Sequence, residues 1–237
     1  MSSDKLVSLR KVEAAELRGK STMLLLDMYN RHFGPFRSLK KEQKASRKIA
    51  AEVNVEFEMF NSGYLTALAF PNPGDPRVSF MSGSFMDFRP QFAAWNFEGY
   101  VPPEKLDDYL RTSKPMHDKM QQAVQKFRAL GVRKADVVVM IALALLKRIE
   151  HAGLMTAEFV DYKDELLRQW FASLKAEFGE ERGVQQQSRL MLFYFEMDCI
   201  AQRVSAYFIL QQMQLNSTDD FSCGISEHMQ KLELDDE

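Results

Sequence analysis

The sequence predicts an all-α domain that carries one small β-hairpin, and three observations favour this fold class. Most of the chain repeats its large apolar residues every three or four positions, which is the spacing of one face of a helix. Residues 71–88 break that pattern with a Pro- and Gly-rich loop and two short segments on either side of Ser82 and Gly83. The chain has 237 residues, 46% of them hydrophobic, which is enough for one domain with a sizeable core.

The first half of the chain divides into a lead-in and two helices. Residues 1–20 are charged throughout and predict a polar helical lead-in, followed by a single domain over residues 21–237. The first helix of that domain ends at Gly34 and Pro35, because proline cannot continue a helix. The second helix starts after Leu39. Its large apolar groups fall on one stripe, at Ile49, Val53, Phe57, Phe60, Tyr64 and Leu68.

The hairpin pairs residues 77–81 with residues 84–88, and more helices follow it. An isolated hairpin is marginal in water, so this one must pack on helices. Residues 135–146 are nearly all apolar and do not alternate, which predicts a helix buried on all sides. A polar link at residues 179–187 precedes the last helix. The helices expected after the hairpin span about 104–111, 115–130, 135–152, 156–178 and 188–215.

Composition and charge exclude several classes of protein. The net charge of −2 shows no basic excess, so we expect no direct DNA binding by this chain. Cys199 and Cys223 are too few for a zinc site of four thiolates, and they favour a reducing compartment. The first 20 residues have no apolar core of a secretory signal. The apolar run at residues 135–146 is shorter than the ~20 residues that span a bilayer, so we expect no membrane insertion.

The sequence shows no catalytic or metal-binding pattern, so we expect neither an enzyme nor a cofactor. Asp107 and Asp108 are similar to the magnesium-binding acids of helical isoprenoid enzymes, but Arg111 stands where another acid is needed and no second pair follows. We interpret this pair as an exposed helix face. The four histidines have no carboxylate or cysteine at ligand spacing and are interpreted as surface or partly buried structural residues. They are His32, His117, His151 and His228.

Residues 29–44 carry a more specific pattern. An aromatic residue and a base precede a Gly-Pro turn, which leads into Phe-x-x-Leu and then an acidic-polar pair. This string resembles the signature of nuclear hormone receptor ligand-binding domains, most closely those of divergent nematode receptors, and a looser likeness extends from about Leu24 to Leu215. The resemblance implies a layered antiparallel helical sandwich with its hairpin after the second helix. It also implies a nuclear protein, with the cytoplasm as the alternative, that regulates transcription and has no zinc DNA-binding module in this chain.

The resemblance further implies a small lipophilic ligand, held between the first two helices, the hairpin and the last helix. The candidate lining residues are core-facing groups on those elements. They are Met23, Leu26, Asn30, Phe57, Phe60, Asn61, Phe85, Phe127 and Ile200. The alternative is that these residues are plain core. An interior filled by the 18 Phe and 14 Met would make the protein a ligandless dimerisation or scaffold domain.

A coregulator helix is the second partner that the resemblance implies. A base at one end of a shallow groove and an acid at the other would clamp a bound helix, because helix ends carry unpaired backbone groups. The residues at the matching positions are Arg31, Phe36, Leu39, Ile49 and Glu227. Around Glu227 the chain departs from the family pattern, since Gly224 and His228 stand where large apolar groups are expected. The alternative for Arg31 is an ordinary solvated base.

The last long helix is a candidate interface for a homo- or heterodimer. It carries apolar groups on more than one face, because Phe193, Tyr194, Tyr207 and Phe208 cannot all point inward. The family that this chain resembles uses the corresponding helix as its dimer seam, and a self-complementary patch there would give a twofold dimer. We expect Gln202, Arg203 and Tyr207 to lie in that interface.

Overall fold

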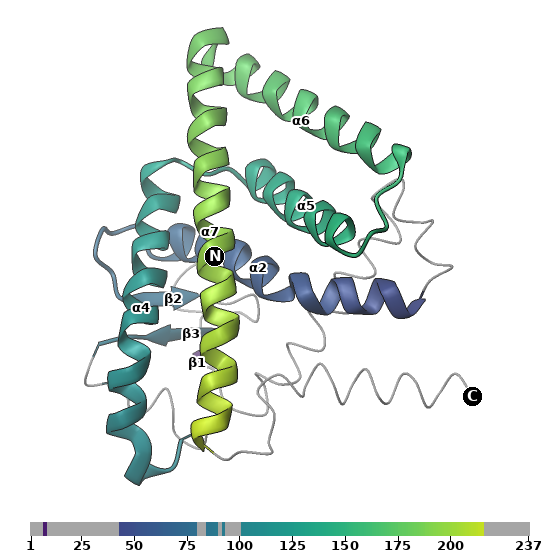
Figure 1. Cartoon of the computed structure of the whole chain (residues 1–237). Helices are drawn as coiled ribbons and strands as arrows, with labels where there is room; N and C mark the ends of the chain where they lie inside the picture. The colour runs from purple at the N-terminus through teal and green to yellow at the C-terminus, as the bar shows by residue number, and fades with distance from the viewer. Residues whose placement is uncertain (1–6, 9–42, 80–83, 90–91, 93–100, 216–237) are drawn as a thin grey trace.

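The computed structural model of the protein describes residues 7–8, 43–79, 84–89, 92 and 101–215, and the account below concerns these residues (Figure 1). Most of them are helical, which confirms the all-α character expected from the sequence. The α-helices are α2 (Gln43–Ala69), α4 (Leu106–Ala129), α5 (Lys134–His151), α6 (Ala157–Phe178) and α7 (Glu180–Leu215), and the short 3-10 helix η3 (Pro103–Lys105) precedes α4.

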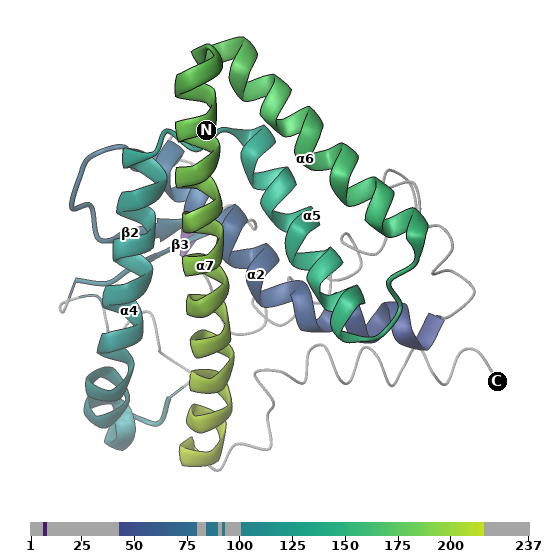
Figure 2. The ribbon, with the colours of Figure 1, turned by 45° about the horizontal axis from the view of Figure 1, so that its top comes forward.

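The other helices are arranged around α2. This helix contacts α4, α5 and α7, and it also contacts strand β2 (Arg77–Ser79). Figure 2 shows α7 running alongside α4 and crossing α2. Helix α5, followed by α6, lies on the side of α7 opposite to α4. Helix α6 packs against α5 and α7. The inner helices α2 and α5 therefore carry most of the core, while α7 keeps one side turned outward.

The apolar patterns on α2 and α5 are confirmed as core-facing, except that Ala135 and Val138 of α5 and Leu68 of α2 are exposed. From residue 137 to residue 146 of α5, every side chain except Val138 is buried. On α2 the stripe from Ile49 to Phe60 is buried, but Leu68 is exposed. The last turn of α2 instead directs Thr66 toward the hairpin, where the Ser79 amide N–H donates to the Thr66 hydroxyl oxygen at 2.8 Å.

The predicted hairpin is confirmed as an antiparallel pair. Strand β2 pairs with β3 (Ser84–Asp87) in the register Arg77 to Asp87. A further strand, β1 (Val7–Ser8), pairs with β3 in parallel and gives the sheet order β1-β3-β2. The helical lead-in expected for residues 1–20 is therefore wrong at Val7 and Ser8, because the edge of β3 offers backbone groups that an extended segment can pair with. The other residues of that segment, and the turn at 80–83, lie outside the described part.

Helix α4 is continuous where two helices were expected. The sequence predicts a break before Pro115, yet α4 runs through it from Leu106 to Ala129. Proline removes one helical N–H donor. Hydroxyl groups in the preceding turn add bonds of their own: Thr112 donates to the Asp108 carbonyl at 2.9 Å, and Ser113 donates to the Leu110 carbonyl at 3.2 Å. Packing of α4 against α2 and α7 also supports the helix.

Helix α7 begins eight residues earlier than the sequence predicts. The polar segment expected to be a link is helical from Glu180, and only Gly179, with φ of +82°, separates α6 from α7. Gly183 lies where the two helices come closest, since a Cβ atom on it would be 3.0 Å from the Lys175 Cα atom. Gly183, which lies within the segment expected to be a polar link, is thus a point of close contact between the two helices.

A second glycine makes room for an aromatic ring in the core. Gly63 of α2 lies directly under Phe127 of α4, and a Cβ atom on Gly63 would be 2.3 Å from the Phe127 ring. The ring is fully buried in this notch and meets Phe193 of α7 edge to face, with centroids 4.8 Å apart. Three helices are therefore joined at the Phe127 side chain.

Candidate functional site

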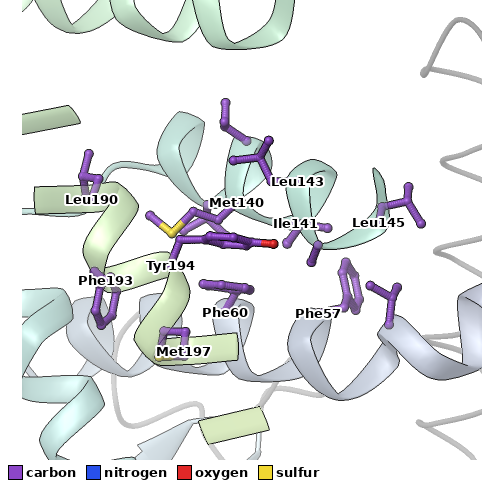
Figure 3. Packing of buried hydrophobic residues seen from close by; sticks show 14 of the residues in the cluster. Phe57, Phe60, Met140, Ile141, Leu143, Leu145, Leu190, Phe193, Tyr194 and Met197 are labelled. Atoms are coloured by element: carbon purple, nitrogen blue, oxygen red, sulfur yellow. The ribbon is translucent and has the colours of Figure 1, made fainter. Parts of the chain in front are cut away.

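Aromatic side chains fill the space between α2, α5 and α7 (Figure 3). Phe60 of α2 lies parallel to Tyr194 of α7, with ring centroids 6.1 Å apart and planes inclined by 6°. Met140 of α5 lies beside the Tyr194 ring in the same view. All three side chains belong to one buried cluster, which shows that this part of the interior is filled by the protein's own side chains.

The proposed ligand-lining residues on the helices belong to this same cluster. Phe57, Phe60, Phe127 and Ile200 are all buried in it. Asn61 is half-buried, and its Nδ2 donates to the Phe57 carbonyl of its own helix at 2.8 Å. The structure brings four of the predicted residues together, but as tightly packed core.

The remaining ligand-lining residues lie elsewhere. Phe85 of β3 is half-buried and meets Phe70 edge to face, with centroids 6.0 Å apart. Met23, Leu26 and Asn30 lie outside the described residues. The ligand site as a whole therefore stays a prediction.

Only one of the proposed coregulator residues is described. Ile49 is 3% exposed and belongs to the core cluster, so its side chain faces inward from α2. Arg31, Phe36, Leu39 and Glu227 lie outside the described residues. The groove between them stays a prediction.

Two buried acids and two half-buried bases from three helices form a second group, which we call the charged centre: Glu56 of α2, Lys147 and Arg148 of α5, and Asp198 of α7. Arg148 Nη2 pairs with Glu56 Oε1. Lys147 Nζ donates to Asp198 Oδ2 at 2.5 Å, and Gln202 Nε2 donates to the same oxygen at 3.1 Å. Glu56 and Asp198 are both buried. The charged centre thus links α2, α5 and α7 next to the aromatic cluster.

The protonation of this region follows from its surroundings. Burial alone would lower the pKa of Arg148, but the bond to Glu56 and the nearby charges of Asp198 and Glu52 raise it. Burial raises the pKa of Tyr194, and the charges of Asp198 and Glu56 add to this effect. Arg148 is therefore cationic and Tyr194 neutral at physiological pH.

Hydrogen bonding in the charged centre is incomplete. Asp198 Oδ1 and Arg148 Nε are both buried, and neither has a hydrogen-bond partner. In the described part of the chain, Asn54 Oδ1 and Arg128 Nε are also buried without a hydrogen-bond partner. Buried polar atoms of this kind are uncommon in folded proteins.

The outer face of α7 carries exposed apolar side chains. Leu192 is 71% exposed, Phe195 56% and Val184 48%. Of the four apolar groups named for this helix, Phe193 and Tyr194 are buried. The side chains of Tyr207 and Phe208 lie outside the described part, so the argument that the four cannot all point inward stays a prediction. A helix has 3.6 residues per turn, so the residues next to a buried pair point to the side or outward. Leu192 and Phe195 flank the buried pair in this way and are exposed.

The predicted dimer residues lie on or near that outer face. Gln202 and Arg203 are exposed. Tyr207 is part of α7, but its side chain is outside the described part. Together with Val184, Leu192 and Phe195, the two exposed residues define what we call the α7 outer face, which extends over roughly 28 Å at 1.5 Å per residue.

A third buried group, the Asp136 clamp, lies at the other end of α5. Asp136 accepts hydrogen bonds from Arg133 Nε at 3.0 Å, Arg133 Nη2 at 2.7 Å and Trp170 Nε1 at 2.7 Å. Sequence reasoning missed both this clamp and the charged centre. The available signal was the presence of single charges, such as Asp136 and Arg148, at the ends of an otherwise apolar helix.

Within the described ranges, no group of three or more His, Cys, Asp or Glu side chains is placed to hold a metal ion. The helices described are each too short or too polar to cross a membrane.

No protein-family model matches the chain, and no curated protein matches it either.

Proposed function

We propose that the protein is a nuclear-receptor-like regulatory domain that acts in the nucleus by associating with protein partners through the α7 outer face. The observation that carries this proposal is the exposure of Leu192 and Phe195 on the longest helix of the described chain. Large apolar side chains that share one face of a helix favour burial against another protein. The order of elements supports the resemblance, because a hairpin follows α2 and a long helix ends the described part.

The partner favoured first is a second copy of the chain. The α7 outer face combines apolar groups with Gln202, which is neutral, and Arg203, which is positively charged. The face as a whole therefore carries no large excess of one charge. Two such faces can meet in an antiparallel twofold pair without strong repulsion. Each additional 100 Å² of apolar surface that is buried contributes about 2.5 kcal/mol before the cost of association is subtracted.

The small lipophilic ligand remains a second part of the proposal, and the ligandless scaffold remains its alternative. The packing of Phe60, Phe127 and Tyr194 against one another favours the scaffold for this part of the interior. Binding of a coregulator helix at Arg31 and Glu227 is kept as a proposal because the resemblance implies it. Native mass spectrometry of the purified protein separates these readings, since it reports a retained ligand and the number of subunits together.

The association itself is tested by sedimentation of the full chain. We expect a dimer at micromolar concentration, and we expect Leu192→Glu or Phe195→Glu to weaken it at least tenfold, because a buried charge without a partner is costly. Arg203→Glu should weaken it less. Val160→Glu is the matched control, since Val160 is 46% exposed on α6, away from this face.

Two results would contradict the proposal. A wild-type chain that is monomeric at high micromolar concentration rules out homodimerisation through α7. Equal weakening by Val160→Glu and Leu192→Glu would show a general effect of added charge, with no role for the α7 outer face.

A further inference from the structure

Two buried atoms of the charged centre have no hydrogen-bond partner, and we call them orphaned atoms. Asp198 is 6% exposed, and its Oδ2 accepts bonds from Lys147 and Gln202 while its Oδ1 has no partner. Arg148 uses Nη2 to bind Glu56, while its buried Nε has no partner. One orphan is therefore an acceptor and the other is a donor.

The two orphaned atoms belong to neighbouring side chains. Asp198 is bonded to Lys147, the residue before Arg148 on α5, and Arg148 is bonded to Glu56, so both atoms belong to one group of ion pairs. A buried acceptor and a buried donor that do not bond to each other are usually bridged by a third group, most often an ordered water with two to four polar contacts.

The chemistry of the missing group follows from the surrounding charges. Glu56 and Asp198 supply two negative charges, and Lys147 and Arg148 supply two positive charges, so the centre is balanced without an added ion. An anion would face the Asp198 carboxylate, and an ammonium group has no lone pair to accept from Arg148 Nε. A hydroxyl group can donate to the carboxylate and accept from the guanidinium at the same time.

We propose that a neutral hydroxyl group is bound between Asp198 Oδ1 and Arg148 Nε, donating to the first and accepting from the second. Its source is either an ordered water or the alcohol end of a small lipophilic molecule. The apolar side of such a molecule would meet the aromatic cluster, where Figure 3 shows the Tyr194 hydroxyl directed along α2 and α5 past Phe60. Gln202 belongs both to this site and to the α7 outer face, but the test below concerns Arg148 and does not depend on association through α7.

The test uses the wild-type chain and the N–H groups of its arginine side chains. In water-selective NMR, the Arg148 Nε–H proton should show a persistent cross-peak to a long-lived hydroxyl and slow exchange with bulk solvent. Arg133 is the matched buried control, because its Nε donates to Asp136 Oδ2 at 3.0 Å. Arg168 is the exposed control, with its Nε bonded to Glu165 Oε2 at 2.8 Å.

Each outcome decides the proposal. A cross-peak to water at Arg148 and none at Arg133 supports bound water. Cross-peaks to carbon-bound protons that disappear after organic extraction and refolding support an alcohol ligand. A protected Arg148 Nε–H with no hydroxyl cross-peak overturns the proposal, because the proton would then be bonded within the protein. Exchange as fast as that of Arg168 also overturns it, because the atom would then be open to solvent.

Discussion

The two ends of α5 each hold a buried ionic group, and the two groups differ in how fully their polar atoms are bonded. At the N-terminal end, both oxygens of Asp136 accept hydrogen bonds, and Arg133 Nη1 pairs with Glu177. At the C-terminal end, Asp198 and Arg148 each keep one orphaned atom. The difference teaches that two ionic groups on one helix can differ in completeness. The completed network fixes one geometry, and the incomplete one is where we propose a bound hydroxyl group.

The largest expected effect is at the completed group. Asp136→Asn removes the charge that Arg133 and Trp170 both bind, so it should lower the free energy of unfolding by about 3–5 kcal/mol. Urea denaturation followed by circular dichroism measures this change. Glu165→Gln, in the exposed pair with Arg168, is the control and should change stability by no more than about 0.5 kcal/mol.

The difference in stability between wild type and Asp136→Asn should disappear at low pH. Burial alone would raise the pKa of Asp136, but the hydrogen bonds from Arg133 and Trp170 lower it below the ordinary value. The stabilisation is therefore present above the unfolded-state pKa, near 4, and is lost as the pH falls through the folded-state pKa. If Asp136→Asn costs as much at the lowest pH as at pH 7, the carboxylate charge is not what stabilises the clamp.

A half-buried histidine on α4, His117, should give the next largest effect, in a different pH window. His117 lies 4.4 Å from the Phe88 ring, and burial lowers its pKa to about 4. Because the unfolded state takes up this proton first, the stabilisation is present above pH ~6.5 and is lost between there and pH ~4. We expect wild type to lose about 2–3 kcal/mol over that range relative to His117→Gln.

Denaturation at pH 7 and pH 4.5 measures the His117 contribution. His151→Gln is the matched control, because His151 is exposed at the end of α5. Parallel pH profiles of His117→Gln and wild type would show that His117 takes no part in the acid sensitivity.

The smallest effect is expected at the incomplete group. Glu56→Gln leaves Arg148 next to Asp198, so it should cost only about 1–3 kcal/mol. Replacing Glu56 and Arg148 together by Met should cost less than Glu56→Gln alone, since removing both partners leaves no unpaired charge. Thermal and urea denaturation of the single and double variants measure the change in the free energy of unfolding. A double variant less stable than Glu56→Gln would contradict the contrast drawn between the two ends of α5.

Local patterns in the sequence predicted much of the fold. The stripe on α2 and the apolar run of α5 depend on residues a few positions apart, and so does the hairpin. The misses depend on contacts between distant segments. Pro115 stays inside α4 because α2 and α7 support that helix, and Val7 forms a strand because it reaches β3.

The candidate site was less predictable than the fold. Phe57 and Phe127 were expected at the interior and are there, but sequence alone could not tell a filled core from a pocket. The charged centre combines side chains from three helices, and their meeting is set by helix packing, which periodicity does not encode. On α7, the sequence showed apolar groups on more than one face but not which of them lie outside: Phe193 is buried, whereas its neighbour Leu192 is exposed.

The notch at Gly63 has a consequence for how the sequence can change over time. A side chain at residue 63 would collide with the Phe127 ring, so each position limits what the other can be. Gly63→Ala should be tolerated only where residue 127 is smaller than Phe, and a smaller residue 127 should open a cavity unless residue 63 grows. The two positions are therefore expected to be inherited as a pair, and any relative of this protein that carries a larger residue at 63 should carry a smaller one at 127.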